Sequence, residues 1–423
     1  MYLPERNLYI NDKNNVMVDL NSYRIFYLTE NIIRTLKNYT TDFISYNEDE
    51  KSVIEEIDKI QILSTTEIIE KNYYDTIKIH VSNTCNLRCK YCYAQGGNYG
   101  GNASLMHTKT ADKVLKMIYE YPQFQKLKDI TFFGGEPLLA WKLIEYICKN
   151  TQKKQVRYLL QTNGTILNDN IIKILKEYNI YVTVSIDGFE HMHDYNRIDK
   201  FGKGTYQQVI KNIKKMKANG IKVVEIQATI SSEFANQYTK QEIADVLYKS
   251  TDVKRIKVEY ELQYENETIK AEEDIIQEIE NFFDKIFKEA YIFDNDVFKV
   301  ISTILCQKYK DYICSAGNRM VTVDVNGRIF PCQLFLDNKL MYMGESDGEI
   351  MEEGGRMFKK SAKKDCRNCF ARSTCYVCAA KGVSERKCKS NRILTEKVLE
   401  YITMLVYEEK YIEFYNKFVK LYS

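Results

Sequence analysis

The chain has 423 residues, of which 61 are basic and 58 acidic, so its net charge is only +3. This balance argues against nucleic acid as the main partner, and a hydrophobic content of 44% excludes global disorder. The N-terminus MYLPERNLYIND lacks the apolar core of a signal peptide, and no run of about 18 apolar residues occurs. We therefore expect a cytoplasmic protein of several domains without a membrane partner, whose 12 cysteines serve metal or redox chemistry.

Residues 1–75 are expected to form a separate N-terminal module. Asn7–Ile10 and Val16–Leu20 have the composition of strands on either side of a polar turn, and Thr29–Leu36 and Glu48–Ile60 have helical apolar spacing. This order resembles the RiPP recognition element, a small winged-helix module. The resemblance implies binding of the leader segment of a ribosomally made precursor peptide, usually as an added strand at a sheet edge. The alternative is a generic cap on the following domain.

Residues 76–300 show six β-rich runs that alternate with helical stretches. This alternation predicts a parallel sheet with helices on one side, and six units are too few for a closed eight-stranded barrel. In such folds the active site lies at the carboxyl ends of the strands. The predicted strands are Thr76–Ser82, Asp129–Phe133, Gln155–Thr162, Ile180–Ile186, Val223–Ile230 and Arg255–Leu262. The predicted helices are Lys109–Tyr121, Ala140–Lys149, Asn168–Tyr178, Tyr206–Ala218, Lys240–Tyr248 and Glu272–Ala290.

Three cysteines, Cys85, Cys89 and Cys92, follow the first predicted strand directly with C-x3-C-x2-C spacing. Three thiolates in one short loop can hold an iron–sulfur cluster and leave one iron open to a small molecule. The alternative is a structural zinc site whose fourth ligand lies elsewhere in the chain.

This pattern, with the aromatic Tyr91 before the third cysteine and Gly134–Gly135–Glu136–Pro137 after the second strand, resembles the radical S-adenosylmethionine (SAM) enzymes. The resemblance implies a partial (β/α)6 barrel and a [4Fe-4S] cluster whose open iron chelates SAM. Reductive cleavage of SAM would release a 5′-deoxyadenosyl radical that abstracts a hydrogen atom.

By the same resemblance, the segment Gly134, Gly135, Glu136 and Pro137 would contact the amino group of SAM. Ser185 and Arg197 would hold its carboxylate, because the arginine fork can donate two parallel hydrogen bonds. Asn163 and Asp187 end the third and fourth strands, where a cofactor contact and simple loop capping are equally good interpretations.

A second set of cysteines occupies residues 301–390 and resembles the SPASM domain, an extension with two auxiliary [4Fe-4S] clusters. Two residues separate Cys375 from Cys378, where the family usually has three. The resemblance assigns Cys314, Cys332 and Cys378 to one cluster, with Cys306 as candidate fourth ligand. It assigns Cys366, Cys369, Cys375 and Cys388 to the other. Zinc bound by the two C-x2-C pairs is the alternative. Cys148 is expected to be a buried thiol on a barrel helix.

Residues 391–423 are expected to form one closing helix. Leader-binding module, barrel and SPASM domain together resemble maturases of ribosomal peptides, which implies an intramolecular thioether crosslink as the product. The expected partners are the precursor peptide and an electron donor such as ferredoxin or flavodoxin. Two alternatives remain: an anaerobic sulfatase maturase that oxidises Cys or Ser to formylglycine, and a zinc-stabilised binding protein without radical chemistry.

Overall fold

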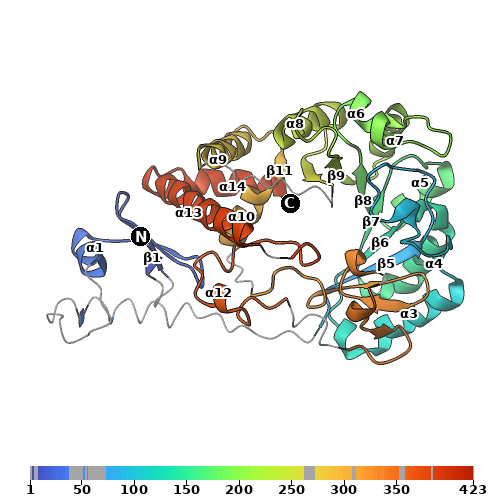
Figure 1. The fold of residues 1–423 in the computed structure, drawn as a ribbon, viewed down its shortest axis with the longest axis horizontal. Coiled ribbons are helices and arrows are strands. Elements are labelled where there is room, and N and C mark those ends of the chain that lie inside the picture. The colour runs from blue at the N-terminus through green and yellow to red at the C-terminus, as the bar shows by residue number, and fades with distance from the viewer. Residues whose placement is uncertain are drawn as a thin grey trace.

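The structure is a computed structural model that describes residues 2–3, 8–37, 51–52, 55, 73–261, 272–306, 311–336, 338–351, 358–382 and 384–422. Its centre is a ten-stranded sheet in the order β11-β10-β9-β8-β7-β6-β5-β12-β13-β14 (Figure 1). Pairing is parallel from β11 through to β12, and antiparallel from β12 to β14. The result is an α/β fold whose sheet is mostly parallel.

The six predicted β-α units are confirmed. The strands are β5 (Thr76–Ser82), β6 (Asp129–Gly134), β7 (Arg157–Thr162), β8 (Tyr181–Ser185), β9 (Val223–Ile230) and β10 (Arg255–Tyr260). The helices that follow them are α3 (Thr108–Glu120), α4 (Trp141–Thr151), α5 (Asp169–Glu177), α7 (Tyr206–Ala218), α8 (Lys240–Thr251) and α9 (Glu272–Phe287). In Figure 1, α3, α4 and α5 cover the outer face of the sheet on the right.

Side-chain alternation explains why the helices cover this face. Ile77, Ile79 and Val81 of β5 are fully buried in one apolar core with α3 residues Val114 and Ile118. The intervening β5 side chains point to the opposite, concave face, because successive strand residues alternate. Polar side chains can therefore line the interior of the partial barrel while its outside is packed against helices.

Several elements lie outside the six predicted units. A further helix, α6 (Glu190–Asn196), follows β8, and a short strand, β11 (Ile292–Asp294), is followed by α10 (Asp296–Leu305). The C-terminal part contributes β12 (Met320–Val323), β13 (Arg328–Phe330), β14 (Gly344–Glu345) and the short helix α12 (Lys364–Arg367). Strand β12 pairs in parallel with β5, so the cysteine-rich segment extends the sheet of the barrel.

The N-terminal residues form a four-stranded antiparallel sheet, β1 (Tyr2–Leu3), β2 (Leu8–Asn11), β3 (Val16–Asp19) and β4 (Ile25–Tyr27), followed by α1 (Glu30–Lys37). The two predicted strands and the first predicted helix are confirmed. The predicted helix Glu48–Ile60 lies largely outside the described residues. The winged-helix identity of the module stays a prediction.

The single closing helix predicted for residues 391–423 is wrong. The tail consists of α13 (Glu385–Tyr407) and α14 (Tyr411–Tyr422). Ser384 starts α13 by accepting a hydrogen bond from the backbone of Lys387, and Glu409, at φ +60°, interrupts the helical path between the two. Apolar periodicity continues across this break, which is why the sequence pattern concealed it.

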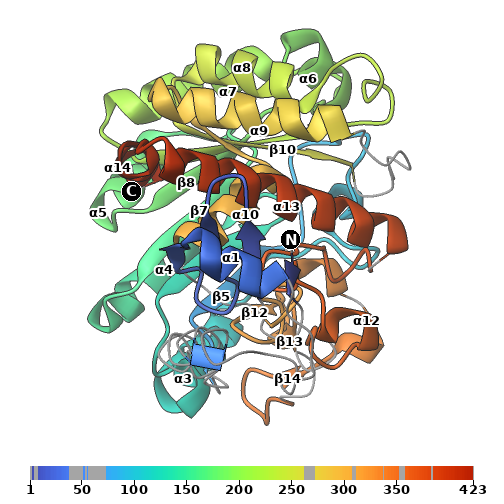
Figure 2. The same ribbon diagram turned by 90° about the vertical axis from the view of Figure 1, so that its left-hand side faces the viewer.

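The tail helices connect the N-terminal sheet to the barrel (Figure 2). Tyr9 and Val18 of the N-terminal sheet share an apolar core with residues of α9, α10, α13 and α14. The Asn11 amide also donates a hydrogen bond to Thr403 Oγ1 on α13 (2.7 Å). None of the described helices is long and apolar enough to cross a bilayer.

Candidate active site

Cys85, Cys89 and Cys92 lie in the loop that follows β5, at the carboxyl ends of the parallel strands. Burial raises the pKa of the Cys89 thiol to about 12, and nearby Cys85 and Cys92 contribute smaller increases. Burial likewise raises the pKa of Cys85 to about 11. The three thiols thus influence one another electrostatically, and their role as cluster ligands stays a prediction.

Three N–H groups point at sulfur atoms of this loop. The backbone N–H of Leu87 donates to Cys85 Sγ (3.4 Å), and that of Gly96 donates to Cys92 Sγ (3.4 Å). The Asn163 side-chain amide also approaches Cys85 Sγ (3.7 Å). Hydrogen bonds to sulfur favour the thiolate, which is the form that binds iron. The residues of the loop therefore fit an iron–sulfur cluster.

The glycines of the Gly134–Pro137 motif let two loops approach each other. A Cβ on Gly135 would lie 2.4 Å from the carbonyl oxygen of Thr84 and 2.9 Å from Gly97 Cα. The backbone N–H of Gly135 donates to Ser82 O (2.8 Å), and that of Glu136 donates to Thr84 O (2.9 Å). The motif therefore supports the base of the cysteine loop, a role the sequence prediction did not include.

The carboxylate of Glu136 is fully buried and accepts three hydrogen bonds. They come from Thr162 Oγ1 (2.7 Å), the backbone N–H of Asn163 (2.8 Å) and the backbone N–H of Leu138 (3.0 Å). Burial raises the pKa of Glu136, although these donors oppose the rise. These contacts join the end of β6 to the end of β7. The predicted contact between this carboxylate and SAM stays a prediction.

Asp187, directly after β8, connects several parts of the site. It is fully buried and accepts a short hydrogen bond from the Tyr91 hydroxyl and one from Arg197 Nε (2.9 Å) through one oxygen. Its other oxygen accepts the backbone N–H of Thr229 (2.9 Å). The Arg197 guanidinium also lies over the Tyr91 ring, 5.6 Å from its centre. Asp187 thereby fixes the aromatic residue that precedes Cys92.

The two residues predicted to hold the SAM carboxylate differ in their surroundings. Burial lowers the pKa of Arg197, but Asp187, Tyr91 and Cys89 together outweigh burial and the net shift is upward. Arg197 is therefore a permanent cation close to Cys89. Ser185 is half-buried at the end of β8, next to Gln227 of the neighbouring strand. The structure brings both residues to the carboxyl ends of the strands, as predicted.

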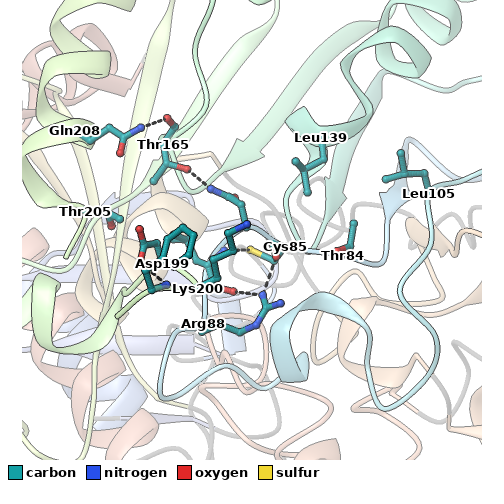
Figure 3. A pocket seen from close by; sticks show the side chains of 13 residues that line it. Thr84, Cys85, Arg88, Leu105, Leu139, Thr165, Asp199, Lys200, Thr205 and Gln208 are labelled. Carbon is teal, nitrogen blue, oxygen red and sulfur yellow. Dashed lines mark hydrogen bonds between the residues drawn. The ribbon is translucent and has the colours of Figure 1, made fainter. Parts of the chain in front are cut away.

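A chain of amide hydrogen bonds supports the cysteine loop from the other side (Figure 3). Asn163 Nδ2 donates to Asn86 Oδ1 (3.0 Å), and Asn86 Nδ2 donates to Thr165 Oγ1 (2.8 Å). Gln208 of α7 then donates to the Thr165 carbonyl (2.7 Å). Sequence reasoning left the role of Asn163 open. The segment Gln161–Gly164 at a strand end was the only available signal, because the partners are distant in sequence.

The segment after α6 pairs with the cysteine loop through its backbone. Arg88 N–H donates to Ile198 O (2.7 Å), and Lys90 N–H donates to Asn196 O (3.0 Å). His193 on α6 is fully buried, its Nδ1 accepting the backbone N–H of Asp187 (3.2 Å). Burial lowers the pKa of His193 to about 4, so the imidazole is neutral. His193 therefore belongs to a structural hydrogen-bond network that ties α6 to the end of β8.

The C-terminal cysteines form two groups. In the first, burial raises the pKa of Cys332 to about 11, and nearby Cys314 and Cys378 add to the rise. Lys78, on the concave side of β5, lies close enough to oppose that rise. Burial also raises the pKa of Tyr93 to about 12, with small contributions from both Cys92 and Cys332. Lys78 Nζ also donates to the side-chain oxygen of Gln333 (3.2 Å), the residue after Cys332, so this part of the first group lies beside the concave face of β5.

In the second group, burial raises the pKa of Cys375 to about 11. The positive charge of Lys360 opposes this rise, and the nearby Cys388, Cys369 and Cys366 add to it. The SPASM domain and its assignment of these cysteines to two clusters stay predictions. The Lys360 side chain is buried and donates hydrogen bonds to the carbonyl oxygens of Cys375 (2.8 Å) and Arg372 (2.5 Å).

Two further cysteines complete the set. Cys306 is exposed at the C-cap of α10, and residues 307–310, which join it to Cys314, lie outside the described residues. Its role as a ligand stays a prediction. Cys148 on α4 is fully buried, as predicted. Within the described ranges, no group of three or more His, Cys, Asp or Glu side chains has the arrangement to hold a single metal ion.

Comparison with known proteins assigns part of the chain to a family. The family model of the radical SAM superfamily matches residues 79–232. The cysteine-type anaerobic sulfatase-maturating enzyme of Clostridium novyi (strain NT) is 32% identical over 142 residues, covering 31% of this chain and 37% of that protein. The radical SAM cyclopropyl synthase TigE of Paramaledivibacter caminithermalis is 29% identical over 196 residues, covering 43% of this chain and 39% of that protein. The chain thus spans less than half of the length of these curated relatives.

Solved structures share the fold over a larger part of the chain. Native anSMEcpe with bound AdoMet has a TM-score of 0.62 at 20% identity, covering 79% of this chain and 99% of that chain. Streptococcus suis SuiB bound to precursor peptide SuiA has a TM-score of 0.53 at 15% identity, covering 86% of this chain and 92% of that chain. Residues 79–232 are therefore a radical SAM domain, and the chain is related in sequence to sulfatase-maturating enzymes and to a radical SAM cyclopropyl synthase.

Proposed function

We propose that this chain is a radical SAM enzyme that modifies a ribosomally synthesised precursor peptide and forms an intramolecular thioether crosslink. The observation that carries the proposal is the group of Cys85, Cys89 and Cys92 at the barrel mouth, with N–H groups directed at their sulfurs. A [4Fe-4S] cluster held there, with SAM on its open iron, supplies the 5′-deoxyadenosyl radical that removes a hydrogen atom from the substrate.

The protein's own residues prepare this site. The glycine motif brings the end of β6 against the cysteine loop, and Asp187 fixes Tyr91 beside it. Arg197, a buried cation near Cys89, favours the thiolate form of that ligand. A loop fixed from several sides holds the reacting atoms in one geometry, which is the main contribution a protein makes to cofactor chemistry.

The proposal includes two auxiliary [4Fe-4S] clusters, three in all. Cys314, Cys332 and Cys378 would hold one, with Cys306 as the fourth ligand, and the group around Cys375 would hold the other. The first group adjoins the barrel interior through Lys78 and Tyr93. It could therefore accept an electron from a substrate radical inside the barrel. Lys360 beside the second group adds a buried positive charge that would favour the reduced form of a bound cluster.

The leader of the precursor would bind to the N-terminal sheet. β4 is one of the two edge strands in the order β1-β2-β3-β4, and the Tyr27 side chain on it is 66% exposed although its hydroxyl donates to the Val406 carbonyl of α13 (2.8 Å). An extended peptide can add to such an edge through main-chain hydrogen bonds and pack a side chain against the tyrosine.

One experiment tests the enzymatic core of the proposal. The protein is reconstituted anaerobically with iron and sulfide, and 5′-deoxyadenosine is measured with dithionite as reductant. Replacement of Cys85, Cys89 and Cys92 by Ala should abolish SAM cleavage and leave iron in the C-terminal part. Cys148→Ala removes a fully buried thiol on α4, outside the cysteine loop, and should retain cleavage. Undiminished 5′-deoxyadenosine from the triple variant, or a colourless zinc-loaded wild-type protein, would refute the proposal.

Leader binding needs its own measurement. Deleting the module would remove Tyr9 and Val18 and expose the apolar residues of α13 and α14 that pack against them, so a point substitution is preferable. Tyr27→Ala should weaken affinity for a leader peptide about tenfold, or about 1.4 kcal/mol. Tyr119→Ala is the matched control: like the Tyr27 hydroxyl, which donates to the Val406 carbonyl of α13 (2.8 Å), the hydroxyl of this exposed tyrosine donates to a helix carbonyl, that of Asn150 in the barrel (2.8 Å). Equal affinities for both variants would contradict the proposed edge.

Maturation of a sulfatase is a second candidate, favoured by sequence relatives that carry this name. The two functions differ in product. A leader-bearing cysteine-containing peptide should lose two mass units when a thioether forms, whereas a sulfatase-derived peptide would yield formylglycine. Mass spectrometry of both peptides after reaction therefore decides between them.

A further inference from the structure

A groove of about 590 Å³ opens beside Cys85, between the cysteine loop and the loop that follows α6 (Figure 3). Its lining includes Arg88 from the cysteine loop, Leu105 and Leu139 from the barrel, and Lys200 and Phe201 from the second loop. We call it the Cys85 groove. It reaches the side chain of a proposed iron ligand from the protein surface.

The rim of the groove carries apolar side chains that the described residues leave in contact with solvent. Phe201 is 76% exposed, Leu105 48% and Leu139 36%. A single exposed apolar residue needs no explanation, but several around one concave site are typical of a surface that another protein covers. Lys200 lies over the Phe201 ring, 4.9 Å from its centre, so a cation borders the most exposed of them.

The charges at the groove are mainly positive. Arg88 and Lys200 line it, and Lys203 lies in the same exposed loop. Among the described lining residues Asp199 alone is acidic, and its Oδ1 accepts the backbone N–H groups of Phe201 (2.8 Å) and Lys203 (2.9 Å). This single carboxylate lies near both lysines and offsets part of their charge, so with Arg88 the groove keeps a net positive charge.

The Arg88 guanidinium has a second role. Its Nη1 donates to the carbonyl oxygens of Cys85 (2.8 Å) and Leu87 (2.7 Å), so it binds the backbone on which the ligand sits. The basic rim and the cysteine loop are thus one continuous structure. A protein that contacts the rim comes into the immediate neighbourhood of Cys85.

We propose that the Cys85 groove is the docking surface for a small acidic electron-carrier protein. This inference rests on the proposed function. In the step it serves, the reduced carrier loses one electron, the cluster held by Cys85, Cys89 and Cys92 gains it, and no bond forms or breaks. Redox complexes bury little area, so a groove with a short apolar rim is sufficient, and opposite charges accelerate encounter.

The precursor peptide is the competing occupant. Chemistry on the peptide belongs at the barrel mouth, where the strand-end residues converge, and the proposed leader edge lies on the N-terminal sheet. A redox partner needs only to approach a cluster ligand, and the groove gives access to Cys85. The acidic carrier is therefore the occupant that the charges and the position favour.

The test compares two reductants on the full-length, anaerobically reconstituted protein. Lys200→Glu/Lys203→Glu reverses the rim charge, and Phe201→Asp removes the most exposed apolar contact; neither change touches the residues of the proposed catalytic site. Lys128→Glu/Lys153→Glu is the matched control. It carries the same charge change just before β6 and β7, at the opposite ends of the strands.

With reduced flavodoxin as the acidic carrier, 5′-deoxyadenosine formation by the two rim variants should fall about tenfold at low salt. Added salt should slow the wild type and affect the rim variants less. With dithionite all proteins should react equally. A direct readout independent of turnover is the affinity for oxidised flavodoxin by calorimetry, which should weaken about tenfold in the rim variants alone.

Three results would overturn the inference: rim variants that match the control with flavodoxin, an equal loss of rate with dithionite, or weakened leader-peptide affinity with unchanged flavodoxin affinity. A wild-type protein that fails to cleave SAM with dithionite would refute the proposed function instead. The flavodoxin affinities would then still report on the groove.

Discussion

Replacement of Asp187 by Asn should destabilise the barrel strongly, although the two side chains have the same shape. One carboxylate oxygen of Asp187 accepts hydrogen bonds from Tyr91 and Arg197, and the other accepts the backbone N–H of Thr229. An amide has only one acceptor oxygen. Whichever way it is oriented, at least one of these donors faces an N–H group.

The size of this loss of stability follows from the burial of the ion pair between Asp187 and Arg197. The side chain of Asp187 is 0% exposed and that of Arg197 is 10% exposed, so the arginine charge would lose its partner in a largely dry environment. Removing one member of a buried ion pair costs about 3–5 kcal/mol. We therefore expect Asp187→Asn to lower the free energy of unfolding of the barrel by about that amount, and to reduce iron retained by the cysteine loop.

Trp141 provides the assay, because it is the only tryptophan of the chain and lies at the start of α4 in the barrel. Its fluorescence during urea denaturation follows this part of the protein selectively. The matched control is Asp129→Asn, which breaks a two-bonded pair with Arg157 whose arginine is 66% exposed. That loss should be under about 1 kcal/mol. Equal shifts for the two variants would show that burial of Asp187 does not decide its contribution.

Two further predictions concern residues around the loop. Gly135→Ala should lower the free energy of unfolding by about 1–3 kcal/mol and lower the iron content, because its Cβ would lie 2.4 Å from Thr84 O and 2.9 Å from Gly97 Cα. The control is Gly101→Ala, whose Cβ would have its nearest contact at 3.4 Å and which should change neither quantity. Similar iron contents in the two variants would contradict the packing argument. For His193, burial lowers the pKa in the folded state to about 4. The contribution of the neutral imidazole to the free energy of unfolding is therefore complete above pH 6.5 and is lost as the pH falls toward 4. Between pH 7.5 and 5.5 the wild type should therefore lose about 1 kcal/mol more than His193→Asn, measured by the same fluorescence; parallel pH profiles would contradict this.

The barrel could be predicted from the sequence because its signals are local. The predicted bounds of three elements equal the observed ones: Thr76–Ser82, Val223–Ile230 and Tyr206–Ala218. β-rich runs and helical spacing can be recognised from a short stretch of neighbouring residues. β12 was not found, because a four-residue strand carries little local signal and is fixed by its parallel partner β5, far away in the sequence. The break at Glu409 was missed for a related reason: a single left-handed residue leaves the apolar pattern intact.

The same distinction applies to the site. The cysteines could be predicted because their spacing in the chain sets their spacing around a ligand. Asp187 and Asn163 could not be assigned a role, because each acts through partners brought together only by the fold. Asn163, for example, contacts Cys85 and Asn86 across 78 and 77 positions of the chain. Short motifs therefore reveal the ligands, and the side chains that hold those ligands in place emerge only in three dimensions.

The parallel pairing of β12 with β5 also determines how the two halves of the protein can work together. β5 leads into the loop with Cys85, and β13 leads to Cys332, so one sheet carries both cysteine groups, with β12 between the two strands that lead to them. A rigid sheet fixes the separation of the groups far better than a flexible domain linker could. If electrons pass from substrate to the first auxiliary group, their path is therefore set by strand register, and it should survive substitutions in the loops but not the loss of β12 pairing.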